Sequence, residues 1–408
     1  MSNQINENTI NVTHYELMSK LPDPFLFNDG TKVKTKEDWA KRREELYEKT
    51  VELHFGGMPP EPEFLEVEPL CYGSINIFRI KTGTRANPII MDMYLFKACS
   101  KSNSAPVVIS GDMCFGRVFN PEFIKSITDR DINFVLFNRT ELAPDISIYN
   151  LDDLKTTETG EYKLGDEIWQ SLRDGNCGGQ IKKTYPDGKF SAVSAWAWGY
   201  SRCVDALEIL GNVDLDLIAF TGHSRGAKTA ALAGIVDERA AIVNPNATCC
   251  GGNSGYRIYM EATMEDGTVA KSERLDNIFR LFPAWMGQDM REYIGNEGAM
   301  PFDSHDFKAM VAPRILFVSE GAHDIWANPV GSWQTTLAAG EVYKFLDCPE
   351  NLYWYFRTGG HNQTPEDLGQ LANIINHVRY GEEINDKFFK RPFRYIEPAY
   401  DWKCPEND

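Results

Sequence analysis

The amino-acid sequence predicts an α/β fold, in which a mainly parallel central sheet is covered by helices on both faces. Two observations lead to this prediction. Short apolar runs of strand length recur along the chain, and several are bounded by Gly, Asn, Asp or Pro. Helix-like stretches lie between these runs. Continuous apolar strands that alternate with helices are typical of a parallel sheet buried on both sides, which makes a three-layer α/β/α sandwich.

The individual elements follow from this alternation of apolar runs and helix-like stretches. The expected strands are Val107–Ser110, Ile132–Phe137, Leu217–Thr221, Ile242–Val243, Ile315–Val318 and Leu352–Phe356. The expected helices are Ala192–Leu210, Arg225–Val236, Asp306–Met310, Pro329–Phe345 and Pro365–Tyr380. Strands of this length separated by helices are the pattern of repeated strand–helix–strand units.

The first hundred residues have a different pattern. Asp38–Val51 is charged and helix-like, whereas Glu63–Met93 is strand-like, with apolar and polar residues alternating over Ser74–Ile80. No linker rich in Pro, Gly or Ser divides the chain. We therefore expect one domain over residues 1–408, with residues 1–100 as an N-terminal extension packed on it.

Composition excludes several classes of protein. The chain has 408 residues, 42% of them hydrophobic and 12% aromatic, which is enough for a large core and argues against disorder or a fibrous repeat. The 42 basic and 59 acidic side chains give a net charge of −17, which argues against nucleic acid or an anionic membrane as a partner. No run of about 18 apolar residues is present to span a bilayer. The oligomeric state stays open.

The N-terminus and the cysteines bear on the compartment and on cofactors. Residues 1–11 read MSNQINENTIN, with no apolar or basic signal region, so we expect a cytoplasmic protein unless a leader has been removed. The nine cysteines are irregularly spaced, without C-x-x-C, and H-E-x-x-H does not occur. This pattern predicts neither a disulfide framework nor a bound metal, and we expect no cofactor.

One motif indicates chemistry. Gly222-His-Ser-Arg-Gly226 matches G-x-S-x-G, with an expected strand before it and a small-residue helix after it. In a nucleophile elbow, the turn from strand to helix is so tight that glycines are needed on either side of the serine. The serine hydroxyl then projects near the positive N-terminus of the helix, and the amide of Arg225 points to where an oxyanion would form. The alternative is a tight turn in which Ser224 is a bystander.

A serine nucleophile needs a general base and an acid that orients the base. Asp324 follows the expected strand Ile315–Val318, and His361 follows the strand Leu352–Phe356. Open α/β sheets place their sites at the carboxyl ends of the strands, where Ser224 also emerges. Ser224, Asp324 and His361 also occur in the chain order that is usual for this arrangement. Glu320 is a competing acid on the same strand end as Asp324.

These motifs resemble the glucuronoyl esterases of carbohydrate esterase family 15, whose nucleophile signature is G-[CH]-S-R-x-G-K-x-A. The segment Gly222–Ala230 (GHSRGAKTA) is similar except that Ala227 stands in place of the second glycine. Further similar segments are Leu21–Gly30, Ser194–Arg202, Cys250–Asn253, Phe282–Trp285, Pro301–His305, Val311–Arg314 and Asp324–Pro329. The resemblance covers most of the chain, and it implies an α/β-hydrolase fold.

The resemblance also implies roles for individual residues. It makes Ser224 the nucleophile, His361 the base and Arg225 an oxyanion-stabilising residue, and it places Lys228 and Trp326 against the sugar. From the residue types alone, Lys228 could also be a solvated helix residue and Trp326 part of the core. Arg225 and Lys228 together suggest a small cationic site.

Three departures from the family pattern are visible. Many members carry the catalytic glutamate at the position of Ala247, so the acid here is expected on the later strand, as Asp324. The glutamate and glutamine that bind the sugar in fungal members have no clear counterparts near Phe282. His223 replaces a cysteine that is cross-linked in fungal members.

The sequence therefore predicts a serine ester hydrolase that acts on a small carbohydrate ester through an acyl-enzyme. The resemblance implies a 4-O-methyl-glucuronate ester with a lignin-derived alcohol. Two alternatives stay open, because a fold does not fix a function. One is an acetyl-sugar esterase on the same scaffold, and the other is a non-catalytic carbohydrate-binding homologue.

Overall fold

The computed structural model of the chain describes residues 12–98, 104–145, 147, 178–264, 266–391, 393–394 and 396–406. Residues 1–11, on which the expectation about a leader rests, lie outside the described residues, as do Cys99 and Cys177. The cysteines within the described part are free thiols. In the same part, no helix is both long and apolar enough to cross a bilayer.

A nine-stranded sheet with the order β12-β11-β8-β7-β5-β6-β4-β3-β2 forms the centre of the molecule. Its strands are β2 (Phe64–Cys71), β3 (Ile75–Gly83), β4 (Pro88–Phe96), β5 (Val107–Ser110), β6 (Asn133–Phe137), β7 (Ile218–His223), β8 (Ala240–Asn246), β11 (Ile315–Gly321) and β12 (Leu352–Arg357). The strands from β6 to β12 pair in parallel, and the strands from β6 to β2 pair antiparallel. Every residue of β5 and β6 is buried, as continuous apolar strands between two helical layers require.

The N-terminal strands differ from our expectation of an extension that packs on the domain. β4 pairs directly with β6 along Met93–Phe96, so β2, β3 and β4 complete the central sheet itself. Residues in β3 alternate between buried and partly exposed, which is the pattern of a sheet edge with one face toward the core. The extent of the domain over residues 1–408 stays a prediction.

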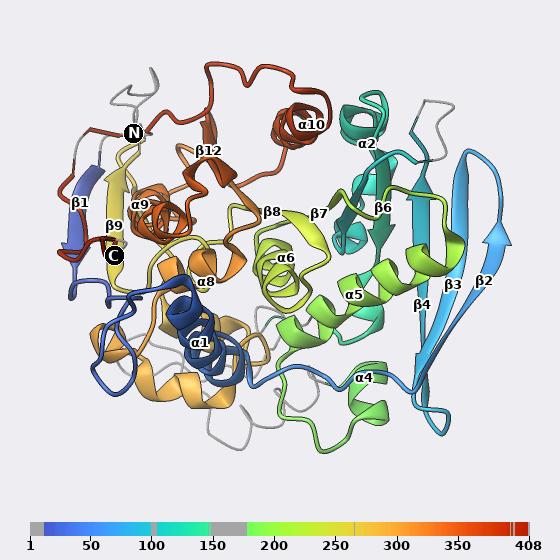
Figure 1. Cartoon of the computed structure of the whole chain (residues 1–408), viewed down its shortest axis with the longest axis horizontal. Helices are drawn as coiled ribbons and strands as arrows, with labels where there is room; N and C mark the ends of the chain where they lie inside the picture. Colours follow the sequence, from blue (N-terminus) through green and yellow to red (C-terminus); the bar gives the residue numbers. More distant parts are fainter. Residues whose placement is uncertain are drawn as a thin grey trace.

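Helices cover both faces of this sheet (Figure 1). They are α1 (Lys36–Tyr47), α2 (Pro121–Thr128), α4 (Gly179–Thr184), α5 (Ala192–Leu210), α6 (Arg225–Val236), α7 (Leu275–Leu281), α8 (Ser304–Val311), α9 (Pro329–Phe345) and α10 (Pro365–Tyr380). Helices α5, α6, α8 and α9 lie on one side, and α2 and α10 lie together on the other. Among the described residues, two large apolar cores fill the spaces between the layers, and a small third cluster includes Ala247 and Ala327. The predicted α/β/α sandwich is therefore confirmed.

Local sequence explains where the longest helices begin. Ser191 caps α5 by accepting a hydrogen bond from the amide of Ser194, and Thr364 caps α10 in a capping box with Asp367. Proline occupies the first position of α9 and of α10, where its missing N–H has no cost. These start signals fix the residue at which each helix begins.

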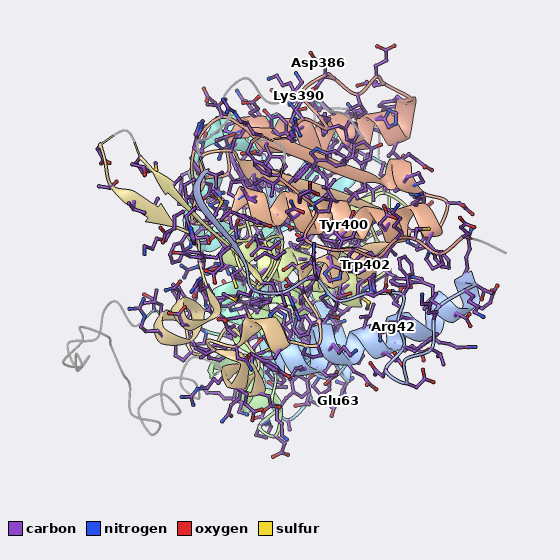
Figure 2. All side chains as sticks on the ribbon, turned by 90° about the vertical axis from the view of Figure 1, so that its left-hand side faces the viewer. Arg42, Glu63, Asp386, Lys390, Tyr400 and Trp402 are labelled. Atoms are coloured by element: carbon purple, nitrogen blue, oxygen red, sulfur yellow. The ribbon has the colours of Figure 1, made fainter. Side chains whose placement is uncertain are left out.

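A small second sheet and the C-terminal segment close one end of the molecule. β1 (Val12–Leu17), β9 (Ile258–Thr263) and β10 (Val269–Lys271) form an antiparallel three-stranded sheet. Figure 2 shows Tyr400 and Trp402 side by side on this face, and their rings are 4.6 Å apart. Trp402 Nε1 donates to Leu21 O at 2.9 Å, so the end of the chain is tied to its beginning.

Candidate active site

Ser224 stands in the strained turn that the G-x-S-x-G motif predicts. It joins β7 to α6 with φ 57° and ψ −121°, a conformation that a non-glycine residue rarely adopts. Its amide donates to Asn246 O on β8 at 3.0 Å, which anchors the turn to the sheet. A Cβ at Gly222 would meet the backbone of Gly226, and a Cβ at Gly226 would meet the carboxylate of Asp112. Both glycines are therefore required by close packing.

Ser224, His361 and Asp324 form one hydrogen-bonded chain. His361 Nε2 lies 2.9 Å from Ser224 Oγ, and His361 Nδ1 lies 2.7 Å from Asp324 Oδ2. The other carboxylate oxygen of Asp324 accepts from the amide of Ala327 at 3.1 Å. Asp324 is 2% exposed, whereas a third of the His361 side chain is open to solvent. A buried carboxylate that holds an accessible imidazole against a serine is the arrangement of a nucleophile with its general base.

The competing acid Glu320 does not contact His361. Its side chain is fully buried, and its Oε1 accepts from Asn253 Nδ2 at 3.1 Å. Burial raises the pKa of Glu320 to about 8, so this carboxyl is protonated at neutral pH. Ala247, where many family members are expected to carry the acid, is buried at the end of β8 with φ 50°. The structure thus gives the contact with the base to Asp324.

His223 lies beside the base and is buried. Its ring centroid is 4.7 Å from that of His361, and its Nδ1 lies 2.8 Å from Asn246 Oδ1. Asn246 uses its amide nitrogen to donate to Ser319, so its oxygen accepts and His223 carries the proton on Nδ1. Burial holds the pKa of His223 well below its usual value, and the ring is neutral.

Arg225 is held in place by a carboxylate and two aromatic rings. Its Nη1 donates to both carboxylate oxygens of Asp145, at 3.1 and 3.2 Å. Asp145 also accepts from Trp285 Nε1 at 3.2 Å and from Arg139. The guanidinium of Arg225 lies 4.5 Å from the ring of Trp285 and 4.7 Å from that of Phe282, and these two rings are stacked. The arginine next to the nucleophile is therefore fixed before any substrate arrives.

Lys228 is buried and paired, so it is not the solvated helix residue that the sequence allowed. Its Nζ lies 3.0 Å from Glu273 Oε2 and also donates to the carbonyls of Thr248 and Cys250. Burial raises the pKa of Glu273, while the Lys228 ammonium opposes that rise. The expected cationic site is thus built from two ion pairs, Arg225–Asp145 and Lys228–Glu273.

Sequence reasoning missed Asp145 and Glu273, which are separated from their partners by 80 and 45 residues. No local pattern signals such a pairing. The sequence does place Arg225 and Lys228 on the first turn of a helix that is expected to be buried. Because buried cations require partners, two carboxylates could have been expected nearby, although not which ones.

Trp326 lies beside the Lys228–Glu273 pair. Trp326 is half-buried and packs against Ala247, Cys249 and Ala327. Its carbonyl accepts from the amide of Glu273 at 3.0 Å, which joins it to the Lys228–Glu273 pair.

The loop after β5 lies beside the nucleophile turn. Its Asp112 accepts from the amide of His223 at 2.7 Å, which packs the loop against the nucleophile turn. The amides of Gly111, Asp112, Phe115 and Gly116 donate within the protein. Arg225, next to the nucleophile, stays the expected oxyanion-stabilising residue.

Potential metal ligands do not gather around these groups. Within the described ranges, no cluster of three or more His, Cys, Asp or Glu side chains is arranged to hold a metal ion. The expectation of a chain without a cofactor stays a prediction.

Comparisons with known proteins agree with the geometry. A model of the family described as "Glucuronyl esterase, fungi" matches residues 164–347. The chain is 26% identical over 379 residues to a 4-O-methyl-glucuronoyl methylesterase of Schizophyllum commune, covering 91% of this chain and 86% of that protein.

Solved structures agree as well. A carbohydrate esterase family 15 glucuronoyl esterase from Caldicellulosiruptor kristjansonii is similar over 95% of this chain and 98% of that one, with 25% identity and a TM-score of 0.77. The fold is also that of a mutant glucuronoyl esterase from Sporotrichum thermophile, which was solved in complex with methyl 4-O-methyl-β-D-glucopyranuronate. That similarity has 20% identity, a TM-score of 0.68 and 94% coverage of both chains.

Proposed function

Because this chain belongs to the glucuronoyl esterases of carbohydrate esterase family 15, we propose that it hydrolyses esters of 4-O-methyl-glucuronic acid through an acyl-enzyme on Ser224. The chain is a carboxylic ester hydrolase of the α/β-hydrolase fold. The observation that carries the proposal is the hydrogen-bonded chain Ser224–His361–Asp324 at the end of the parallel sheet.

The proposed reaction follows from this geometry. His361 Nε2 takes the proton from Ser224 Oγ as the oxygen attacks the ester carbonyl, and Asp324 stabilises the imidazolium through Nδ1. The negative charge on the carbonyl oxygen develops beside Arg225, whose position is already fixed by Asp145 and the two rings. The alcohol leaves with the proton from His361, and water then hydrolyses the acyl-enzyme by the reverse proton path.

The ion pairs support a neutral sugar ester as the substrate. A uronate ester carries no charge, and only the acid released by hydrolysis does. A site with an unpaired lysine and arginine would favour that acid, whereas Lys228 and Arg225 are each balanced by a carboxylate. Trp326 offers a partly exposed aromatic face beside the Lys228–Glu273 pair. Lys228 Nζ already donates to three acceptors, so a sugar hydroxyl contacts it by replacing one of them. We assign Lys228 and Trp326 to substrate binding on this basis.

The test compares two small esters with purified protein. We expect the wild-type chain to hydrolyse methyl 4-O-methyl-glucuronate with a much higher kcat/KM than acetylated xylose. Ser224→Ala should lose about 10⁴-fold or more of this activity with an unchanged circular dichroism spectrum.

Two outcomes would contradict the proposal. A preference for acetylated xylose would identify an acetyl-sugar esterase on the same scaffold. Absence of a fluorophosphonate adduct on Ser224 would remove both enzyme assignments and leave a carbohydrate-binding homologue.

A further inference from the structure

The loops that carry the acid and the base are joined to each other. The amide of Ala322 donates to Arg357 O at 2.7 Å, and the amide of His323 donates to Gly359 O at 3.0 Å. In return, the amide of Gly359 donates to His323 Nδ1 at 3.3 Å. These bonds continue the pairing of β11 with β12 beyond the ends of both strands. Asp324 and His361 follow directly, so the distance between them depends on this junction.

One buried arginine holds the loop that carries the base. Arg357 Nη1 donates to Thr358 O at 3.1 Å, and Nη2 donates to Gly360 O at 3.0 Å and to Asn362 O. These carbonyls lie on both sides of His361 in the sequence. Arg357 is 6% exposed. Thr358, Gly360 and Asn362 are themselves exposed, so the buried guanidinium is what ties this surface loop to the interior of the protein.

The same guanidinium is anchored to the helix that follows the loop. Arg357 Nε donates to Asp367 Oδ2 at 2.8 Å, and Asp367 is fully buried. That oxygen also accepts from the amide of Thr364 at 2.8 Å at the start of α10. Arg357 therefore links the end of β12, the loop with His361 and the N-terminal turn of α10 through one planar group.

We propose that Arg357 is a positioning residue for the catalytic base. The proposal rests on the assignment of His361 under the proposed function. The fixed, planar fork of guanidinium donors sets the path of residues 358–362, and that path sets the direction of the His361 ring toward Ser224. The side chain of His361 bonds to Ser224 and Asp324, whereas Arg357 bonds to the carbonyls around it, so Arg357 acts through the backbone.

Gly359 shows how tightly the loop is built around this group. Its φ is +117°, and a Cβ there would lie 2.7 Å from Arg357 Nη1. A Cβ at Gly321, at the end of β11, would lie 2.6 Å from Gly360 O. Gly359→Ala therefore disturbs the same contact from the backbone side and offers an independent variant.

The experiment measures how fast Ser224 reacts with a fluorophosphonate, per folded molecule, in Arg357→Met, Arg357→Lys and wild type. We expect labelling and kcat to fall about 100-fold in Arg357→Met with KM unchanged, since small misplacements of catalytic groups have effects of this size. Arg357→Lys keeps the charge but offers no fork to the three carbonyls, and it should be intermediate.

The control is Arg42→Met. Arg42 is also buried, is paired with Glu45, and donates to a loop carbonyl, that of Pro24. It lies in α1, away from the loops of the acid and base, so the labelling rate of its folded fraction should match wild type. If Arg357→Met does not fold, Arg357→Lys and Gly359→Ala decide in its place.

Wild-type labelling rates per folded molecule in the Arg357 and Gly359 variants would overturn the proposal. Equal losses in Arg42→Met would also overturn it, because they would indicate a general effect of destabilisation. The fluorophosphonate contains no sugar, so this comparison remains valid if the wild-type chain labels but does not hydrolyse uronate esters. In that case the substrate assignment fails and the role of Arg357 is still tested.

Discussion

The site has two halves that are built differently. The reacting half consists of Ser224, His361 and Asp324, which lie at the ends of three parallel strands and expose the imidazole to solvent. The other half consists of the buried ion pairs Lys228–Glu273 and Arg225–Asp145, with Trp285 between them. In the first half each group needs one precise direction. In the second half each charge needs a partner, because burial without one is costly.

The two halves differ in whether their ionisable groups can exchange protons with solvent. The reacting half keeps an ionisable base within reach of solvent, so protons can enter and leave. The binding half has its charges neutralised in buried or half-buried ion pairs, so it carries little net charge. We infer that rate and pH dependence arise from the first half and sugar selectivity from the second.

The largest expected effect separates the two carboxyls on the end of β11. Asp324→Asn should lower kcat about 10³- to 10⁴-fold, because the base then loses the partner that fixes its tautomer and stabilises its charged form. Glu320→Gln should retain activity near the wild-type level, since Glu320 bonds to Asn253 and not to His361. Steady-state kinetics on the methyl uronate ester checks both, and a larger loss in Glu320→Gln would reverse our choice of acid.

A smaller effect is expected in the binding half. Lys228→Met removes hydrogen bonds to a charged group and leaves Glu273 buried without its partner, so kcat/KM for the uronate ester should fall about 10- to 100-fold, mainly through KM. Hydrolysis of an aryl acetate, which has no sugar, should change little. Equal losses on both esters would show that Lys228 supports the turn of Ser224 rather than the sugar.

The partner of Arg225 gives a third comparison. Asp145→Asn keeps the shape of the side chain but removes the charge that fixes the guanidinium, and kcat should fall about tenfold with KM nearly constant. Asp92→Asn is a matched control, because Asp92 pairs with Arg79 in the antiparallel part of the sheet. Similar kinetics for the two variants would show that fixing Arg225 has no catalytic value.

The last comparison concerns stability and not turnover. The pKa of Glu320 is about 8 in the folded chain, because the carboxyl is buried, and 4.5 in the unfolded chain. Stability from this group is therefore lost as pH rises above 4.5. Glu320→Gln should reduce the fall in unfolding free energy between pH 5 and pH 7 by about 2 kcal/mol. Urea unfolding at the two pH values measures this, and identical pH dependence in both proteins would show that Glu320 is ionised when buried.

Much of the fold follows from short-range sequence signals. The bounds of α6, α9 and α10 agree with the predicted ranges, because proline, capping residues or the elbow mark their starts. β8 was predicted over Ile242–Val243 only, yet it runs from Ala240 to Asn246. Its polar end resembles a loop in sequence. In the structure, Asn244 is buried and donates to Phe317 O across the sheet at 2.8 Å.

Some residues of the site could likewise be predicted from the sequence, and others could not. Ser224, Asp324 and His361 could be placed from strand ends and chain order, since parallel strands bring their carboxyl ends to one edge. Asp145, Glu273 and Arg357 could not, because their importance depends on tertiary contacts that no spacing rule describes. The burial of His223 was likewise invisible, as it depends on the packing of its ring against His361.

The central claim is that the site has a reacting half around Ser224 and a sugar-binding half around Lys228. A crystal structure of Ser224→Ala with bound methyl 4-O-methyl-glucuronate tests this claim most directly. We predict that the ester carbonyl lies between residue 224 and Arg225, that His361 faces the scissile oxygen, and that sugar hydroxyls contact Lys228 and Glu273 beside Trp326. A sugar bound elsewhere, with Lys228 still enclosed by Glu273 and the two backbone carbonyls, would contradict the account.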